Sequence, residues 1–156
     1  MIGGIHIDGL KEISDAMLKL PQKVAANALR QAVYAGAVVI RNEARQRAPV
    51  NTGTLRRSII VRRPKKKTDR NVQKMEVAVR RGKKYRNQGR RGNLSQDAWY
   101  WHFIEFGTKA TRRRQYAAPA RPFMRPAFDA KKMDAVTAIA NKLRTSIEAK
   151  GGKVDG

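Results

Sequence analysis

Both tryptophans of the chain lie in one short segment, residues 99–106, which also holds Tyr100, Phe103 and Phe106. A segment with two closely spaced prolines, residues 120–127, follows shortly afterwards. Large aromatic side chains are normally used for packing or for contacts with partners. Because aromatic residues make up only 6% of the chain, their concentration around Glu105 indicates that this segment specifies a particular local shape.

The chain is strongly basic. Lys and Arg number 35 against 12 Asp and Glu, a formal net charge of +23, and residues 56–91 alone hold sixteen basic and two acidic residues, a local net charge of +14. A free monomer with this charge repels itself, so we expect a polyanion or an acidic protein surface as its neighbour.

Size and composition predict a single domain over residues 1–150, followed by a disordered tail, residues 151–156. The chain has no cysteine, which excludes disulfides and thiolate metal sites. It shows neither an apolar run long enough for a membrane span nor a basic leader followed by an apolar stretch. We therefore expect a soluble protein that is made in a reducing compartment.

The spacing of apolar residues in the N-terminal third predicts two helices. Leu10, Ile13, Met17 and Leu20 recur at helical spacing, which predicts a short amphipathic helix that ends before Pro21. From residue 22 the pattern continues to residue 48 and predicts a long helix that stops at Pro49. Its apolar face consists mainly of Ala and Gly, which suits close approach to a sheet or another helix.

The middle of the chain predicts two antiparallel strands. Residues 51–54 form a turn, residues 58–62 are rich in β-branched side chains, and residues 72–80 alternate with Met75, Val77 and Val79 on one face. A basic loop, residues 64–71, joins the strands. Residues 81–96 have little apolar content, and we interpret them as a long mobile loop that orders against a partner.

The aromatic segment is compatible with a strand or a short helix. A helix would place Trp99, Phe103 and Phe106 on one face, whereas a strand would align Trp99, Trp101 and Phe103. In both cases we expect Gly107 to end it. Residues 108–115 then read as an exposed basic loop and residues 116–118 as a short strand.

A last helix should begin near Pro122 and Pro126 and end at Gly151. Its predicted buried side consists of Met124, Ala127, Phe128, Ala135, Ala138, Ile139, Leu143 and Ile147. The fold class predicted is α+β, with a small antiparallel sheet packed against a long N-terminal helix and a C-terminal helix, and with long basic loops.

No catalytic, metal or cofactor motif is recognised, and we expect a protein that is not an enzyme. The two histidines, His6 and His102, lack the spacing of a metal site. Glu105 could pair with His102 as acid and base, but the favoured interpretation is a structural carboxylate. It would be buried or half-buried, and it would cap a backbone turn or pair with a nearby Arg.

Three segments, residues 48–59, 100–108 and 121–128, resemble the neck, head–tail joining or tail-completion proteins of long-tailed double-stranded DNA phages. The resemblance covers roughly residues 10–148 and implies a structural virion protein that forms a ring, usually six-fold, between the capsid connector and the tail tube. It implies that the shared residues mainly determine the fold: Pro49, Thr52, Gly53, Leu55, Ser58, Glu105, Phe106, Gly107, Thr108, Pro122, Phe123 and Pro126.

The implied partners are other copies of the chain, a head-completion or connector protein, a tail-terminator or tail-tube protein, and packaged DNA in the lumen, without a membrane. The implied location is the head–tail junction of the virion, with assembly in the host cytoplasm. We expect the basic loops to contact these partners through Lys65, Lys66, Lys67, Arg70, Lys83, Lys84, Arg86, Arg90, Arg91, Arg112, Arg113 and Arg114.

Docking onto acidic faces of neighbouring rings is the favoured use of these loops, and lining a DNA channel is another. Two alternative functions stay open at this point. One is a tail-terminator ring at the same junction, and the other is a basic nucleic-acid-binding protein in which Trp99, Tyr100 and Trp101 stack on bases.

Overall fold

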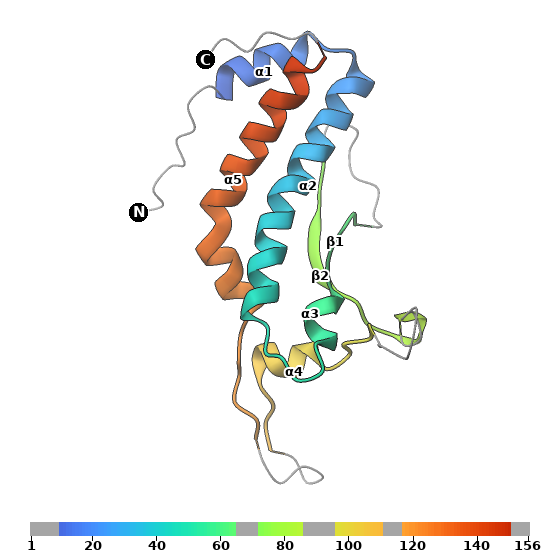
Figure 1. Cartoon of the computed structure of the whole chain (residues 1–156), viewed down its shortest axis with the longest axis vertical. Helices are drawn as coiled ribbons and strands as arrows, with labels where there is room; N and C mark the ends of the chain where they lie inside the picture. Colours follow the sequence, from blue (N-terminus) through green and yellow to red (C-terminus); the bar gives the residue numbers. More distant parts are fainter. Residues whose placement is uncertain (1–9, 65–71, 86–95, 111–116, 151–156) are drawn as a thin grey trace. The chain divides into compact units, whose positions relative to one another are not determined.

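The structure is a computed structural model that describes residues 10–64, 72–85, 96–110 and 117–150 (Figure 1). In these residues the order of elements is α1 (Leu10–Leu18), α2 (Gln22–Arg47), α3 (Thr54–Ser58), β1 (Ile59–Arg62), β2 (Glu76–Val79), the 3-10 helix η1 (Lys83–Tyr85), α4 (Trp101–Phe106) and α5 (Met124–Glu148). Strands β1 and β2 pair antiparallel. The predicted α+β class is confirmed.

The chain forms two compact units. Unit 1 comprises Met1–Val39, Arg63–Glu76 and Lys131–Gly156, and unit 2 comprises Ile40–Arg62 and Val77–Ala130. Each of the two long helices, α2 and α5, therefore contributes one stretch to each unit. That residues 1–150 behave as a single domain stays a prediction.

In unit 1 the first part of α2 and the last part of α5 lie side by side (Figure 1). The core consists of buried Ile13, Ala16, Ala32, Leu143 and Ile147, against which Met17, Leu20, Leu29 and Ile139 pack. The small face of α2 permits this close approach. A Cβ atom at Gly36 would lie 2.6 Å from Ile139 Cγ1 and 2.8 Å from the Ala135 carbonyl oxygen. The predicted boundaries of α1 at Pro21 and of α2 at Pro49 are confirmed.

The core of unit 2 gathers residues from helices and strands. It consists of buried Ala44, Ala48, Leu55, Ile59, Val79, Ala98, Phe123 and Ala127, with Val77, Tyr100, Trp101, Ile104 and Met124 packed against them. The end of α2, both strands, α4 and the start of α5 thus share one apolar cluster. All three segments that carry the family resemblance contribute to it.

Both predicted strands are present but shorter than expected, and one residue predicted to be buried is exposed. Residues 54–58 form helix α3, which follows Gly53 with its left-handed backbone (φ 72°), so β1 begins at Ile59. Strand β2 covers only Glu76–Val79 of the predicted residues 72–80, since its partner β1 offers only four residues. Phe128 is 52% exposed, because the adjacent Ala127 occupies the core instead.

The aromatic segment is helical from Trp101 to Phe106, and it ends at Gly107 as predicted. Of the expected strand at residues 116–118, the structure describes residues 117 and 118, and Ala118 forms an isolated antiparallel bridge with Thr108. Helix α5 begins at Met124, with Pro126 in its first turn as expected, and it ends at Glu148. Most of the predicted loops at residues 64–71, 81–96 and 108–115, and the tail, lie outside the described residues.

Candidate functional site: the motif groove of unit 2

Glu105 links α4 to the start of α5. Its carboxylate is buried at 6% exposure and accepts hydrogen bonds from the backbone N–H groups of Phe123 (2.8 Å), Met124 (3.0 Å) and Arg125 (3.2 Å). The first N–H groups of a helix have no partner within the helix, and an anion at this end also interacts favourably with the helix dipole. The prediction of a buried, capping carboxylate is confirmed, and the partner is backbone rather than an Arg side chain.

Both oxygens of the Glu105 carboxylate are used in this cap. The ring of His102 lies 4.0 Å from the ring of Phe103, centroid to centroid. In the part of the chain that the structure describes, no group of His, Asp or Glu is suited to hold a metal ion. Glu105 therefore has a structural role that accounts for its burial.

Two glycines of the shared segments need their special backbone. Gly107 ends α4 with φ 73°, and a Cβ atom there would lie 2.8 Å from the Ala118 carbonyl oxygen and 2.9 Å from the Ala120 nitrogen. Gly53 has φ 72° and precedes α3, and its carbonyl accepts a hydrogen bond from the Arg57 N–H. Only glycine adopts this conformation at little cost, which agrees with the fold-determining role that the resemblance implies for Gly53.

Ser58 and Leu55 fix the first segment in the core. Leu55 is 3% exposed and Ser58 is fully buried. The Ser58 hydroxyl lies 2.7 Å from the Thr54 carbonyl oxygen and 2.6 Å from the Gln96 carbonyl oxygen. This hydroxyl therefore ties α3 to the chain that leads into the aromatic segment.

Arg45 on α2 holds the start of β1. Its Nε and Nη2 atoms donate to the Ile59 carbonyl oxygen at 3.0 and 2.7 Å. Burial, followed by repulsion from Arg41 and Arg80, lowers the pKa of Arg45, but a guanidinium stays protonated at any physiological pH. Sequence reasoning did not single out Arg45, because its partner is a distant backbone carbonyl.

An apolar groove lies on unit 2 beside these contacts. Its larger hollow, about 440 Å³, is lined by Trp99, Phe103, Thr108, Ala118 and Pro119, and its smaller hollow, about 190 Å³, by residues 50–55. Pro49, Tyr100, Ile104 and Arg121 line both hollows. We call these two hollows together the motif groove, because all three shared segments contribute to its wall.

Two apolar side chains that line the motif groove are exposed. Trp99 is 57% exposed and Val50 is 56% exposed. Trp99 lies in the turn before α4, and its ring meets that of Phe103 edge to face at 6.1 Å, on the face that helical spacing predicts. Sequence reasoning identified this face but did not predict that it would be exposed. This face is exposed because Trp101 and Ile104, on the other side of α4, make the contacts with the core of unit 2.

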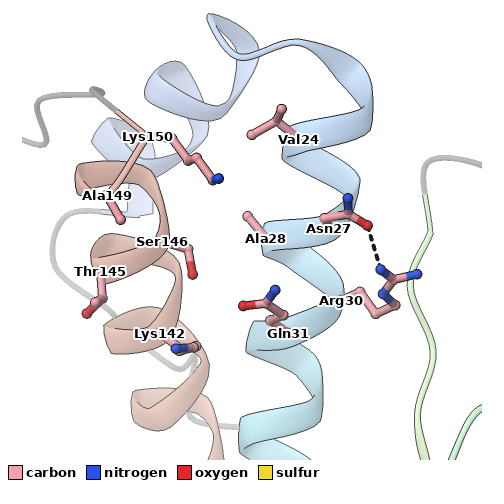
Figure 2. A pocket seen from close by; sticks show the side chains of 10 residues that line it. All are labelled: Val24, Asn27, Ala28, Arg30, Gln31, Lys142, Thr145, Ser146, Ala149 and Lys150. Atoms are coloured by element: carbon pink, nitrogen blue, oxygen red, sulfur yellow. Dashed lines mark hydrogen bonds between the residues drawn. The ribbon is translucent and has the colours of Figure 1, made fainter.

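A second groove belongs to unit 1. Figure 2 shows this space of about 450 Å³ between α2 and α5, with Lys142, Ser146 and Lys150 along one wall. On the other wall Arg30 is hydrogen-bonded to Asn27 (Figure 2). Lys142 lies within α5 and Lys150 lies beyond its end at Glu148.

Most of the basic residues that were predicted to contact partners lie outside the described residues: Lys65, Lys66, Lys67, Arg70, Arg86, Arg90, Arg91, Arg112, Arg113 and Arg114. Lys83 is exposed at the first residue of η1, and the Lys84 backbone belongs to the same turn. The role of these basic residues therefore stays a prediction. None of the helices in the described ranges is long and apolar enough to cross a membrane.

Residues 11–107 match the HK97-gp10-like family, whose description reads "Bacteriophage HK97-gp10, putative tail-component". The chain belongs to this family. The match includes the first shared segment and the second up to Gly107, so Thr108 and residues 121–128 lie beyond it. No curated protein and no solved structure matches the chain. As an HK97-gp10-like protein, the chain is a structural component of a phage tail and is located in the virion.

Proposed function

We propose that this HK97-gp10-like protein forms a six-fold homo-oligomeric ring at the head–tail junction and joins the capsid connector to the tail during assembly. The observation that carries this proposal is membership of a phage tail-component family over residues 11–107. The third shared segment supports it, because it resembles the neck and tail-completion proteins and its Phe123 is buried in the same core as Leu55.

The charge distribution also supports a role between other proteins. The chain carries a net charge of +23, whereas the described residues form only a few surface ion pairs, such as Arg47 with Glu43 and Lys131 with Asp134. A surplus of this size favours association with acidic surfaces and disfavours self-association unless such a surface is present. A protein that should oligomerise only on a completed head or tail must not self-associate while it is free in solution.

The proposal is tested by disrupting the gene in its phage and examining lysates by electron microscopy. We expect filled heads and complete tails of normal length to accumulate separately, and added purified protein to restore joined, infectious particles. Joined particles in the absence of the protein would contradict the proposal. Tails of uncontrolled length would favour the tail-terminator alternative instead, since a terminator stops tube growth.

The nucleic-acid alternative is favoured by one observation, the exposed Trp99 on a strongly basic chain. The mass of the protein in solution, measured at two salt concentrations, distinguishes this alternative from the junction role. For the junction role we expect a monomer that forms a ring only on heads or tails. Binding to bare DNA with a steep salt dependence, and no affinity for either particle, would replace the junction role with a nucleic-acid function.

A further inference from the structure

The three shared segments line the motif groove in addition to forming part of the core of unit 2. Pro49 and Thr52 come from the first segment, Ile104 and Thr108 from the second, and Arg121 from the third. Glu105, Gly53 and Leu55 have clear structural roles. By contrast, Trp99 and Val50 leave more than half of their surface in water at the groove. Apolar side chains that gather at a hollow in this way mark a surface for a partner.

A guanidinium lies in the wall that the two hollows share. Among the described residues that line either hollow, Arg121 is the only charged one. It is exposed, and its backbone N–H donates to the Ile104 carbonyl oxygen at 2.8 Å. Among the described residues its guanidinium has no hydrogen bond or ion pair. A guanidinium at the edge of an apolar hollow is suited to a carboxylate, which it can bind through two N–H groups.

The charge of unit 2 restricts the occupant further. Residues 40–62 and 77–130 hold nineteen Lys and Arg against four Asp and Glu, a net charge of +15. Three of these four carboxylates already have partners within the unit: Glu43 pairs with Arg47, Asp97 accepts the Gly82 N–H, and Glu105 caps α5. A second copy would bring the same positive charge to the groove, so charge complementarity favours an acidic partner.

A nucleic acid would also be acidic, but the walls of the groove fit it poorly. A polyanion needs several cations in a row, whereas the described lining residues of the groove supply only the cation of Arg121. Phe103 and Tyr100 are only partly exposed, and both rings contact Trp99 edge to face. Their faces are therefore not arranged as successive platforms for bases.

We propose that the motif groove binds an extended acidic segment of a neighbouring virion protein, with an apolar side chain in the larger hollow and a carboxylate on Arg121. This inference rests on the proposed junction role. It assigns the acidic docking contact to the shared segments themselves, in addition to the basic loops.

The test selects peptides on the full-length protein from a displayed library of random dodecamers. We expect the enriched peptides to combine Asp or Glu with an aromatic or aliphatic residue. Their affinity, measured by fluorescence anisotropy, should fall about tenfold or more in Arg121→Glu and in Trp99→Ala. Melting curves of each variant check that it is folded.

Two matched variants serve as controls. Arg56→Glu makes the same charge change on an exposed residue of unit 2, and Phe106→Ala removes an exposed aromatic ring from α4. Neither residue lines the motif groove, so both should bind the peptides within about twofold of the unmodified protein. Equal binding by Arg121→Glu, enrichment of basic peptides, or no enrichment would overturn the inference. So would competition for the peptides by an oligonucleotide or by a second copy of the chain.

The same variants distinguish a failure of the groove inference from a failure of the junction role. In the phage lacking the gene, the unmodified protein and Arg56→Glu should restore joined particles, while Arg121→Glu should not. If Arg121→Glu also restores joining, the groove inference fails and the junction role stands. If the unmodified protein restores nothing, the junction role fails, whatever peptides the groove selects.

Discussion

At the scale of single residues, Glu105 is the contact on which the second and third shared segments depend. Its buried carboxylate satisfies three successive N–H groups at the start of α5. In Glu105→Gln the charge is lost, and the side-chain amide NH2 group would face N–H donors. We expect the free energy of unfolding to fall by about 2 kcal/mol, because hydrogen bonds to a charged group contribute about this much. Urea unfolding measures it.

The control is Asp134→Asn, which removes an exposed carboxylate that pairs with Lys131. Exposed pairs contribute little, so this variant should lose less than about 0.5 kcal/mol. If Glu105→Gln proved as stable as Asp134→Asn, the cap would not stabilise the fold and another contact would have to position α5.

The capping role of Glu105 could be predicted from the sequence, because a carboxylate buried among aromatic side chains needs hydrogen-bond donors. The exposure of Trp99 and Phe128 could not be predicted in the same way. Helical spacing identifies which side chains share a face, but the neighbouring elements decide which face is covered. At the start of α5 the small Ala127 fits the core beside Phe123, and Phe128 is left in water.

At the scale of elements, the approach of α2 to α5 in unit 1 depends on Gly36. A methyl group there would meet the Ile139 side chain, which can move, and the Ala135 carbonyl oxygen, which belongs to the helix backbone. Alanine normally stabilises a helix by about 1 kcal/mol relative to glycine. We nevertheless expect Gly36→Ala to lower the free energy of unfolding by about 1–3 kcal/mol, the usual range for overpacking, as measured by urea unfolding.

The matched variant is Gln46→Ala, at an exposed position of the same helix. It tests helix propensity alone and should change stability by no more than about 0.5 kcal/mol. A Gly36→Ala protein that gained stability would mean that α2 and α5 do not pack as closely as the structure shows.

The long elements were predictable because sequence marks their ends. Pro21 and Pro49 delimit α1 and α2, and Pro126 lies in the first turn of α5. The short elements depend on contacts between distant residues. Helix α3 exists because Ser58 meets both Thr54 and Gln96, and β2 is only as long as its partner permits. The motif groove was also not predictable, because its wall comes from three separate segments.

At the scale of the whole molecule, the net charge of +23 should destabilise the isolated protein. Repulsion among like charges is larger in a compact chain than in an unfolded one. Salt screens it, because the Debye length falls from about 30 Å at 0.01 M to about 8 Å at 0.15 M ionic strength. The attractive pairs that salt would weaken, such as Lys131 with Asp134, are exposed and contribute little.

We therefore expect the Tm at pH 7 to rise by about 3 °C between 0.01 and 0.15 M NaCl, which corresponds to about 1 kcal/mol for a chain of this size. Differential scanning calorimetry measures this change. The triple variant Lys65→Gln, Lys66→Gln and Lys67→Gln lowers the net charge by three, so it should melt above the unmodified protein at low salt and together with it at high salt. A Tm that fell with salt would show that attraction outweighs repulsion within the folded chain. The charge would then stabilise the protein itself, and it would no longer argue for an acidic partner.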